Sequence, residues 1–194
     1  MLFLYEEALG YCVGDIVVDK DGISAAVVMA ELANILATQG LTLAAHLTAL
    51  RAKYGLYVSY NTYLFVPDPT VTTRIFTRLR GDASPAAYWS SCAGSTLVRV
   101  LDVTCGYDSS SPSGVSEFPR TPESQMIRFE FDNKVSITLR TSGTEPKLKC
   151  YSEVVSEPGD NRSEGEVREF LERFVNVCIE EMLQPAHNGL QRPN

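Results

Sequence analysis

Residues 140–147 read Arg-Thr-Ser-Gly-Thr-Glu-Pro-Lys, a short run that is rich in hydrogen-bond donors. Arg140 can present its planar guanidinium group to two oxygen atoms at once. Ser142 and Thr144 offer hydroxyl donors, and Gly143, which has no Cβ, lets the backbone approach a ligand closely. These residue types in one loop indicate a site for a phosphate group.

The charge around this run differs from that of the whole chain. Residues 134–149 contain four cations and one acid, which gives a local charge of +3 in a chain of net charge -7. Lys147 either places a positive charge beside the phosphate or is simply a solvated surface side chain. An ordinary hairpin loop with a surface arginine explains the same composition equally well, since Ser, Gly and Thr are common turn residues. Residue chemistry alone therefore leaves both interpretations open.

The bulk composition excludes several classes of function. The acidic net charge disfavours binding to nucleic acid or to an anionic membrane surface. Five widely spaced cysteines without a C-x-x-C pair favour free thiols in a reducing cytosol. The chain has only two histidines, which lie far apart in the sequence, and this disfavours a metal site built from His and Cys ligands. The most apolar run, residues 23–37, is too short to span a bilayer and does not read as a signal peptide.

The first part of the chain reads as a piece of an α/β layer. An apolar strand opens the chain, and helices are expected over residues 24–38 and 42–54. The first helix is apolar on nearly every face, which predicts that it is heavily buried. A strand over residues 56–66 follows, and Pro67-Asp68-Pro69 then breaks the pattern. The sequence therefore predicts a domain boundary between residues 66 and 67.

The second part, residues 67–194, reads as an α+β domain with an antiparallel sheet and helices on one face. Apolar and polar residues alternate in two strands on either side of a two-residue turn at Asp132-Asn133. A return strand over residues 148–154 follows the loop at residues 140–147. Ser163 and Glu166 form a capping box that opens a long amphipathic helix. The polar tail after Pro185 is expected to fray.

Three stretches of the sequence resemble the α-D-phosphohexomutases, the family of phosphoglucomutase and phosphomannomutase. R-T-S-G-T-E-P-K resembles the phosphate-binding loop of the family's last domain. Glu6 and Glu7 lie in Y-E-E-A-L-G, which is similar to the family's sugar-recognition loop, G-E-x-S. Lys20 lies in D-K-D-G, which is similar to a stretch that follows the sugar loop in the family, where its lysine is placed to contact the substrate or the transferred phosphate. Without the resemblance, Glu6 and Glu7 read as a solvated turn, and Asp21 reads as a helix cap.

The resemblance implies a role for each stretch. Residues 1–66 would be the C-terminal part of the family's third, α/β domain, and residues 67–194 its C-terminal domain. Arg140, Ser142, Gly143, Thr144 and Lys147 would bind the substrate phosphate. Glu6, Glu7 and Lys20 would bind the sugar.

The resemblance also implies an enzyme larger than this chain. The family moves a phosphoryl group between two sugar hydroxyls with a phosphoserine, Mg²⁺ and a bisphosphorylated sugar. Neither the serine loop nor the D-x-D-x-D-R magnesium motif occurs in these 194 residues. We therefore expect the C-terminal part of a cytoplasmic isomerase that is inactive alone and works with the missing N-terminal domains. Mg²⁺ and the activator glucose 1,6-bisphosphate would serve that parent enzyme.

Two further functions stay open, and so does the identity of the sugar. The chain could be a stand-alone phosphosugar-binding or regulatory module, or an interaction domain whose basic loop binds a phosphopeptide. Y-E-E-A-L-G looks most like the branch with phosphopentomutases and glucose 1,6-bisphosphate synthases. Ala8 stands where many family members have serine, which argues against a preference for hexose, but hexose, pentose and bisphosphate-synthesising roles all stay open.

Overall fold

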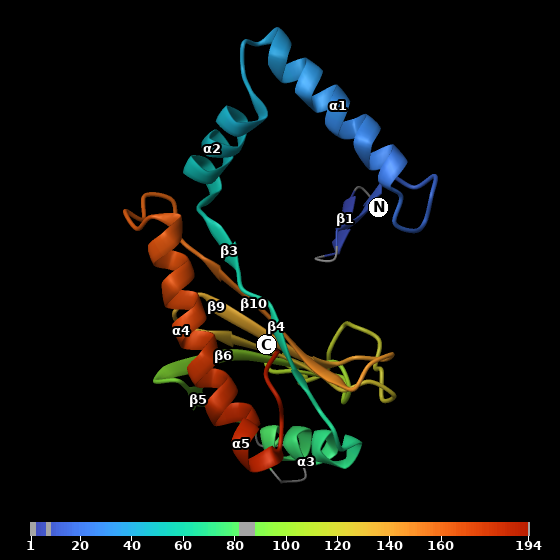
Figure 1. Cartoon of the computed structure of the whole chain (residues 1–194), viewed down its shortest axis with the longest axis vertical. Helices are drawn as coiled ribbons and strands as arrows, with labels where there is room; N and C mark the ends of the chain where they lie inside the picture. The colour runs from blue at the N-terminus through green and yellow to red at the C-terminus, as the bar shows by residue number, and fades with distance from the viewer. Residues whose placement is uncertain (1–2, 7–8, 82–87, 194) are drawn as a thin grey trace. The chain divides into compact units, whose positions relative to one another are not determined.

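The computed structural model describes residues 3–6, 9–81 and 88–193. It divides the chain into two compact units, and the division falls between Tyr54 and Gly55. Figure 1 shows the course of the chain from the first unit, in blue and cyan, to the second.

This division lies ahead of the predicted boundary between residues 66 and 67. Strands β3 (Tyr57–Ser59) and β4 (Thr62–Phe65) both pair antiparallel with β10 (Lys147–Val155). The backbone hydrogen bonds of these two strands therefore belong to the sheet of the second unit. The proline-rich break does not end a domain but leads into α3 (Pro69–Leu79), which Asp68 caps by accepting from the Thr70 N–H.

The first unit consists of a hairpin and two helices. Strands β1 (Phe3–Glu6) and β2 (Gly10–Val13) are antiparallel, with Glu6 opposite Gly10. The helices are α1 (Gly22–Thr38) and α2 (Leu43–Tyr54), and α1 packs against β2. Asp21 caps α1, since its carboxylate accepts from the N–H groups of Ile23 and Ser24.

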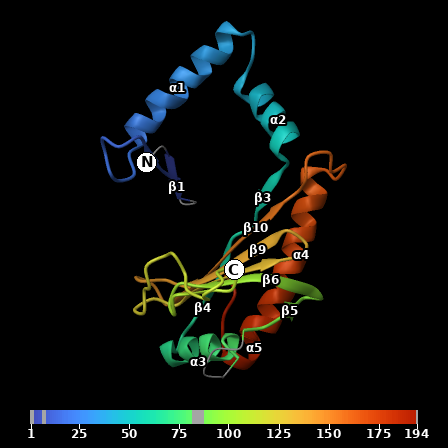
Figure 2. The ribbon, with the colours of Figure 1, turned by 180° about the vertical axis from the view of Figure 1, so that it is seen from behind.

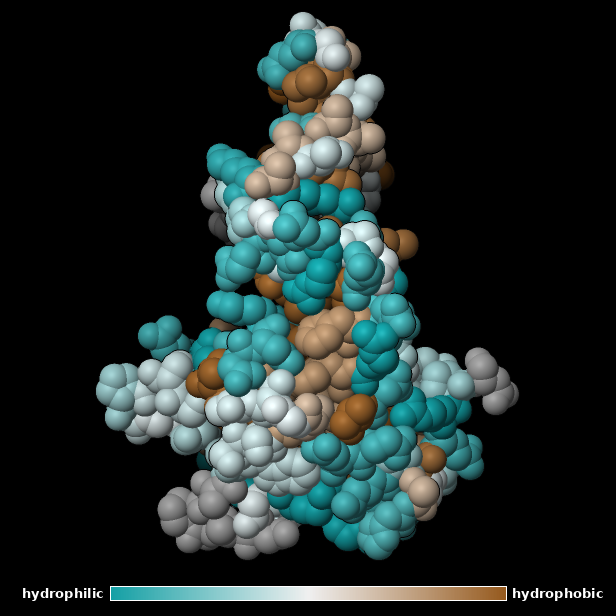
Figure 3. All heavy atoms as spheres, turned by 90° about the vertical axis from the view of Figure 1, so that its left-hand side faces the viewer, coloured by the Kyte–Doolittle hydropathy of each residue, from teal (hydrophilic) through white to brown (hydrophobic). Residues whose placement is uncertain are grey.

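The prediction that the first helix is heavily buried is wrong for this unit. Of the residues of α1, Leu36 is buried, whereas Ile23 is 79% exposed and Met29 54% exposed. Hydrophobic atoms, drawn in brown, reach the surface of this unit in Figure 3. An apolar groove of about 530 Å³ runs between the hairpin and α1.

Within the described parts of the chain, no single helix is long and apolar enough to cross a membrane. The pair α1 and α2 has that length and apolarity only when the two helices are counted together across a 90° bend.

The second unit is built on an eight-stranded sheet whose paired strands are all antiparallel. The sheet order is β3-β10-β9-β8-β6-β5, with β4 paired to β10 and β7 paired to β6. Its other strands are β5 (Ser91–Cys92), β6 (Ser95–Asp102), β7 (Tyr107–Asp108), β8 (Met126–Phe131) and β9 (Val135–Thr141). The two shortest of these, β5 and β7, were not predicted from the sequence.

The core lies between one face of this sheet and α4 (Glu164–Leu183) (Figures 1 and 2). Strand β8 alternates as predicted, with Ile127, Phe129 and Phe131 buried. Phe131 meets Phe174 of α4 edge to face, with ring centroids 5.0 Å apart. The predicted capping box at the start of α4 is present in full. The other face of the sheet is open and carries polar side chains.

The turn between β8 and β9 is one residue longer than predicted. Residues 132–134 form it, and Lys134 has a φ of 67°, in the left-handed region. Its N–H donates to the Phe131 carbonyl, and Asn133 accepts from the Val135 N–H. A three-residue hairpin loop with a left-handed third residue is a common solution, but lysine gives no local signal for it.

The prediction that the tail frays is also wrong. A short helix, α5 (Pro185–Asn188), follows α4, and Leu190 beyond it is buried. Gln191 and Phe65 exchange two backbone hydrogen bonds of 2.8 and 3.1 Å. The tail is therefore held by pairing with β4, a contact that its own polar sequence does not predict.

Candidate functional site

The predicted phosphate loop connects β9 to β10 and is anchored at both ends. The Ser142 N–H donates to the Lys147 carbonyl at 2.9 Å, which closes the loop across its base. The Val66 N–H donates to the Pro146 carbonyl at 2.8 Å, and the Thr141 hydroxyl accepts from the Gln125 N–H at 3.2 Å. A loop tied to strands on both sides can hold donors at fixed positions.

Arg140 stands on the open face of the sheet beside this loop. The strand register places it opposite Lys149 on β10 and opposite Met126 on β8. Tyr63 of β4 pairs with Lys149 and continues the same row. The Arg140 side chain is exposed, and no hydrogen bond or ion pair of its guanidinium group is found among the described residues. Its planar fork is thus free to take two oxygen atoms of a phosphate.

Lys149 lies beside Arg140, although the sequence predicted no role for it as a ligand. It was counted only in the local charge. Because residues opposite each other on antiparallel strands share a face, Lys149 and Arg140 place two positive groups side by side. The alternation of Leu148 and Cys150, both buried, is the signal that could have placed Lys149 on the open face.

Lys147 does not lie free for a ligand. Its ammonium group is 2.8 Å from the Glu145 carboxylate, and its side chain is only 17% exposed. The ammonium also lies 4.4 Å from the ring centroid of Tyr63 and 5.2 Å from that of Phe65. The hydrogen bond with Glu145 raises the pKa of Lys147 and lowers the pKa of Glu145. Glu145 of the same loop therefore holds this lysine, whereas the sequence predicted either a phosphate ligand or a solvated side chain.

The remaining predicted ligands, Ser142, Gly143 and Thr144, form the outer part of the loop. Gly143 and Thr144 are exposed, and Ser142 is half-buried. A Cβ on Gly143 would meet no atom within 4 Å, and its φ is not positive. The backbone does not itself require glycine here, so its small size leaves open space that a ligand can occupy.

A pocket of about 390 Å³ lies behind this loop. Ser142 and Lys147 line it together with two threonines of α3, Thr72 and Thr73. Gln125 also lines it, and its side-chain oxygen is buried without a hydrogen-bond partner in the described part of the chain. An unpaired buried acceptor is an unfavourable feature that a donor group in the pocket would relieve.

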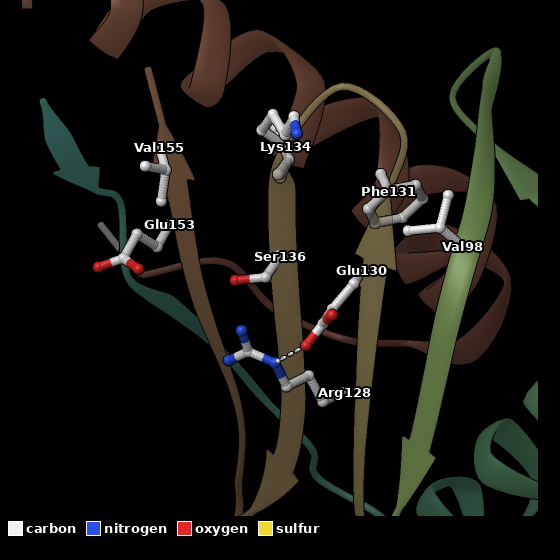
Figure 4. Close-up of a pocket in the computed structure, with 9 residues that line it drawn as sticks. Val98, Arg128, Glu130, Phe131, Lys134, Ser136, Glu153 and Val155 are labelled. Carbon is white, nitrogen blue, oxygen red and sulfur yellow. Dashed lines mark hydrogen bonds and ion pairs between the residues drawn. The ribbon is translucent and has the colours of Figure 1, made fainter. Parts of the chain in front are cut away.

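A second hollow, of about 260 Å³, lies on the open face of the sheet (Figure 4). Arg128 and Glu130 are joined there by a 2.8 Å hydrogen bond, and Ser136 of β9 and Glu153 of β10 also line the hollow. Arg99 lies 3.5 Å from Glu130 as well. The acids and bases largely offset each other here, unlike the cationic row at Arg140.

In the first unit, the structure brings two predicted sugar-binding residues together. The Lys20 ammonium donates to the Glu6 carboxylate at 2.7 Å, and both side chains are about half exposed. This hydrogen bond raises the pKa of Lys20. Asp21 acts as the cap of α1, the alternative role that the sequence suggested for this stretch. Glu7 and Ala8 lie outside the described residues.

A magnesium site is not formed by the residues in view. Across residues 3–6, 9–81 and 88–193, no group of three or more His, Cys, Asp or Glu side chains could hold a metal ion.

The fold and loop define a domain class that comparison with known proteins confirms. Residues 97–170 match the family described as "Phosphoglucomutase/phosphomannomutase, C-terminal domain". The chain is also 44% identical over 190 residues to human glucose 1,6-bisphosphate synthase. That match covers 98% of the chain and 30% of the synthase. The resemblance to phosphohexomutases is thus confirmed.

Other relatives give the same result. Human phosphopentomutase is 38% identical over 98% of the chain and 31% of its own length. A probable phosphoribomutase of Schizosaccharomyces pombe is 36% identical over 97% of the chain and 32% of its own length. The chain therefore spans about a third of the curated relatives it matches. The structure of Paramecium pp63/parafusin, a phosphoglucomutase in its open form, has a TM-score of 0.60 at 18% identity. The match covers 97% of this chain and 31% of the Paramecium protein, and it shows that the two share a fold.

Proposed function

We propose that this chain supplies the phosphate-binding and sugar-binding surfaces of a phosphosugar mutase, an isomerase that moves a phosphoryl group between two hydroxyls of one sugar. The observation that carries the proposal is the exposed guanidinium of Arg140, which has no partner among the described residues and lies beside Lys149 at the base of an anchored donor loop. The family match of residues 97–170 supports the same assignment.

In this function the loop holds the substrate phosphate that does not react. Arg140 forms a two-point contact with that phosphate, and Lys149 adds a second charge. Ser142, Gly143 and Thr144 donate from the loop. Binding energy at this distant group positions the reacting end of the sugar, which is how remote contacts accelerate a reaction.

The Glu6–Lys20 pair supplies the sugar contact. One oxygen of Glu6 takes the Lys20 ammonium, which leaves the other to accept a hydrogen bond from a sugar hydroxyl. Glu7 is part of the same proposed contact.

The transfer itself belongs to groups outside these residues. The serine loop and the aspartate motif that the family needs do not occur in this sequence. We assign the phosphoserine, Mg²⁺ and the glucose 1,6-bisphosphate activator to the parent enzyme, where the ion offsets charge on the transferring group. The missing N-terminal domains are the expected partner, the compartment is the cytoplasm, and the chain alone is inactive.

Binding of glucose 1-phosphate and ribose 1-phosphate to the whole chain tests this function by calorimetry. Sugar phosphate should bind, Arg140→Ala should weaken binding by about ten- to a hundredfold, and Lys134→Ala, at a distant turn, should change nothing. A mutase assay on the same protein should show no turnover. Absence of binding by the unaltered chain would overturn the proposal, and turnover would overturn the inactivity.

A second function is favoured by one observation, the complete core of the second unit. Its buried residues run from Val58 to Leu190 and need nothing from the first unit. A stand-alone phosphosugar-binding module requires such a self-sufficient fold. A chain that binds sugar phosphate but never restores turnover when the missing domains are supplied would favour this module. Preference for a phosphopeptide over a sugar phosphate would favour an interaction domain instead.

A further inference from the structure

The Lys20 side chain crosses the β1–β2 hairpin at Gly10 on its way to Glu6. Glu6 and Gly10 are opposite each other in the hairpin, and Lys20 approaches from the segment that follows β2. A Cβ added to Gly10 would lie 2.3 Å from the Lys20 Cδ and 2.9 Å from its Cγ. Contacts below 3.0 Å are essentially never seen for a Cβ, so the stem of Lys20 fills the space that an alanine would need.

The backbone does not explain a glycine at residue 10. Gly10 is in a strand, and its φ is not in the left-handed region, unlike that of Gly14 four residues later. Any residue can adopt the conformation of Gly10 without strain. Because residue 10 has no side chain, the stem of Lys20 can occupy the space beside it.

The route of Lys20 is fixed by its neighbours. Its N–H donates to the Asp19 carboxylate at 2.7 Å, and the next N–H, of Asp21, donates to the Tyr11 carbonyl at 2.8 Å. Asp21 in turn caps α1. The backbone that follows Lys20 is therefore tied to β2 and to the helix, and from there the side chain reaches Glu6 by passing over residue 10.

We infer that Gly10 is a positioning residue for the Glu6–Lys20 pair, because its missing side chain leaves the path along which Lys20 reaches Glu6. The inference rests on the proposed function for its consequence: Lys20 occupies one oxygen of Glu6 and directs the other toward a sugar hydroxyl. Alanine at residue 10 displaces Lys20, frees Glu6 to rotate and weakens sugar binding without touching the phosphate loop.

NMR titration of the lysine ε-carbons in the whole chain tests the geometry. The protein has five lysines, and Lys20→Arg identifies the Lys20 signal. Because Glu6 raises the Lys20 pKa, Glu6→Gln should lower it, and Gly10→Ala should lower it to a similar degree. Gly22→Ala is the matched control, since a Cβ there meets no atom within 4 Å and its φ is not positive. A Lys20 titration unchanged by Gly10→Ala overturns the inference.

A double-mutant cycle keeps the test decisive if Gly10→Ala unsettles the hairpin. Gly10→Ala should lower the unfolding temperature of the unaltered chain but not of the Lys20→Ala chain, in which the obstructing stem is gone. Equal losses in both backgrounds would mean that residue 10 acts independently of Lys20, and would overturn the inference.

Affinity for glucose 1-phosphate separates this inference from the proposed function. Gly10→Ala should weaken binding by about tenfold, the effect of one charged hydrogen bond, while Gly22→Ala leaves it unchanged. If the unaltered chain binds no sugar phosphate, the proposed function fails, while the titration and the cycle still decide the role of Gly10. If binding is normal in Gly10→Ala, its role in sugar binding is refuted.

Discussion

Arg140 and Lys149 are directly opposite each other on neighbouring strands, at the point where the donor loop leaves the sheet. Both side chains therefore stand on the open face, with Met126 and Tyr63 continuing the row on either side. Lys147, two residues before Lys149, is instead held by Glu145. Two of the three cations near the loop are thus placed to share one anion, and the third is not.

Removing either member of the Arg140–Lys149 pair should weaken the binding of a sugar phosphate. A charged hydrogen bond contributes about 1.5–3 kcal/mol, so each alanine variant should lose about ten- to a hundredfold in affinity. Arg140→Lys should fall between, since lysine keeps the charge but lacks the planar fork. Calorimetry with glucose 1-phosphate, repeated at higher salt, measures these losses.

Lys134→Ala is the control for total charge, because Lys134 is exposed in the turn between β8 and β9 and pairs with Glu157. It should bind like the unaltered chain. Equal losses for Lys134→Ala and Lys149→Ala would show that net charge, and not the row on the open face, governs affinity.

Lys147 should matter less to phosphate binding than Arg140 does. Because Glu145 already offsets its charge, Lys147→Met should lower affinity by less than about tenfold. Glu145→Gln should release Lys147 and leave binding equal or tighter. Calorimetry on both variants checks this order. A loss in Lys147→Met as large as that in Arg140→Ala would mean that the lysine leaves Glu145 and contacts the ligand.

The sequence predicted the elements whose residues repeat with a clear period. Alternation in β8 and β9 identified the buried face, and the Ser163–Glu166 pair located the start of α4. These signals work because a strand repeats every two residues and a helix terminus needs its N–H groups capped. The same periodicity placed Arg140 on a loop-bearing strand, so the main candidate ligand followed from local sequence.

The features that were mispredicted depend on partners far along the chain. Nothing near residues 57–65 shows that β3 and β4 pair with β10, and nothing near Gln191 shows that it pairs with Phe65. The burial predicted for α1 assumed a covering layer that this unit lacks. The engagement of Lys147 required knowing where Tyr63 and Phe65 lie, which charge counting cannot supply.

Asp108 should make the stability of the second unit sensitive to acid. It is buried and accepts two hydrogen bonds from the Arg99 guanidinium group and another from the Ser110 hydroxyl. These contacts hold the Asp108 pKa well below its ordinary value, and the hydrogen bonds from Arg99 have the largest effect. Its unfolded pKa is about 3.9, so its stabilisation is complete above about pH 5 and is lost as pH falls toward the folded pKa.

Asp108→Asn should therefore lower the free energy of unfolding at pH 7 by about 1–3 kcal/mol and flatten its decline below about pH 4. Urea unfolding at several pH values measures both effects. Asp132→Asn, in an exposed turn, serves as the control. A decline of unchanged steepness in Asp108→Asn would assign the acid sensitivity to other groups.

The second unit should fold without the first. The described residues of its hydrophobic core run from Val58 to Leu190, with Leu56 packed against them, so a chain that begins at Gly55 retains them all. Chemical denaturation of that shorter chain should show one cooperative transition. Phe129→Ala, at a fully buried position, should destabilise it by about 3–5 kcal/mol and so prove that the transition reports this core. A transition without cooperativity would mean that the first unit is needed for folding.

The tail should contribute to stability although its sequence is polar. Leu190 is 8% exposed and packs in the core, and Gln191 exchanges backbone hydrogen bonds with Phe65. Leu190→Ala removes buried apolar surface and leaves a cavity, so it should lower the free energy of unfolding by about 2–3 kcal/mol. Pro193→Ala, at an exposed position in the same tail, should change it by less than about 0.5 kcal/mol. Urea unfolding of the two variants decides between a docked tail and a frayed one, because a frayed tail would make both substitutions equally harmless.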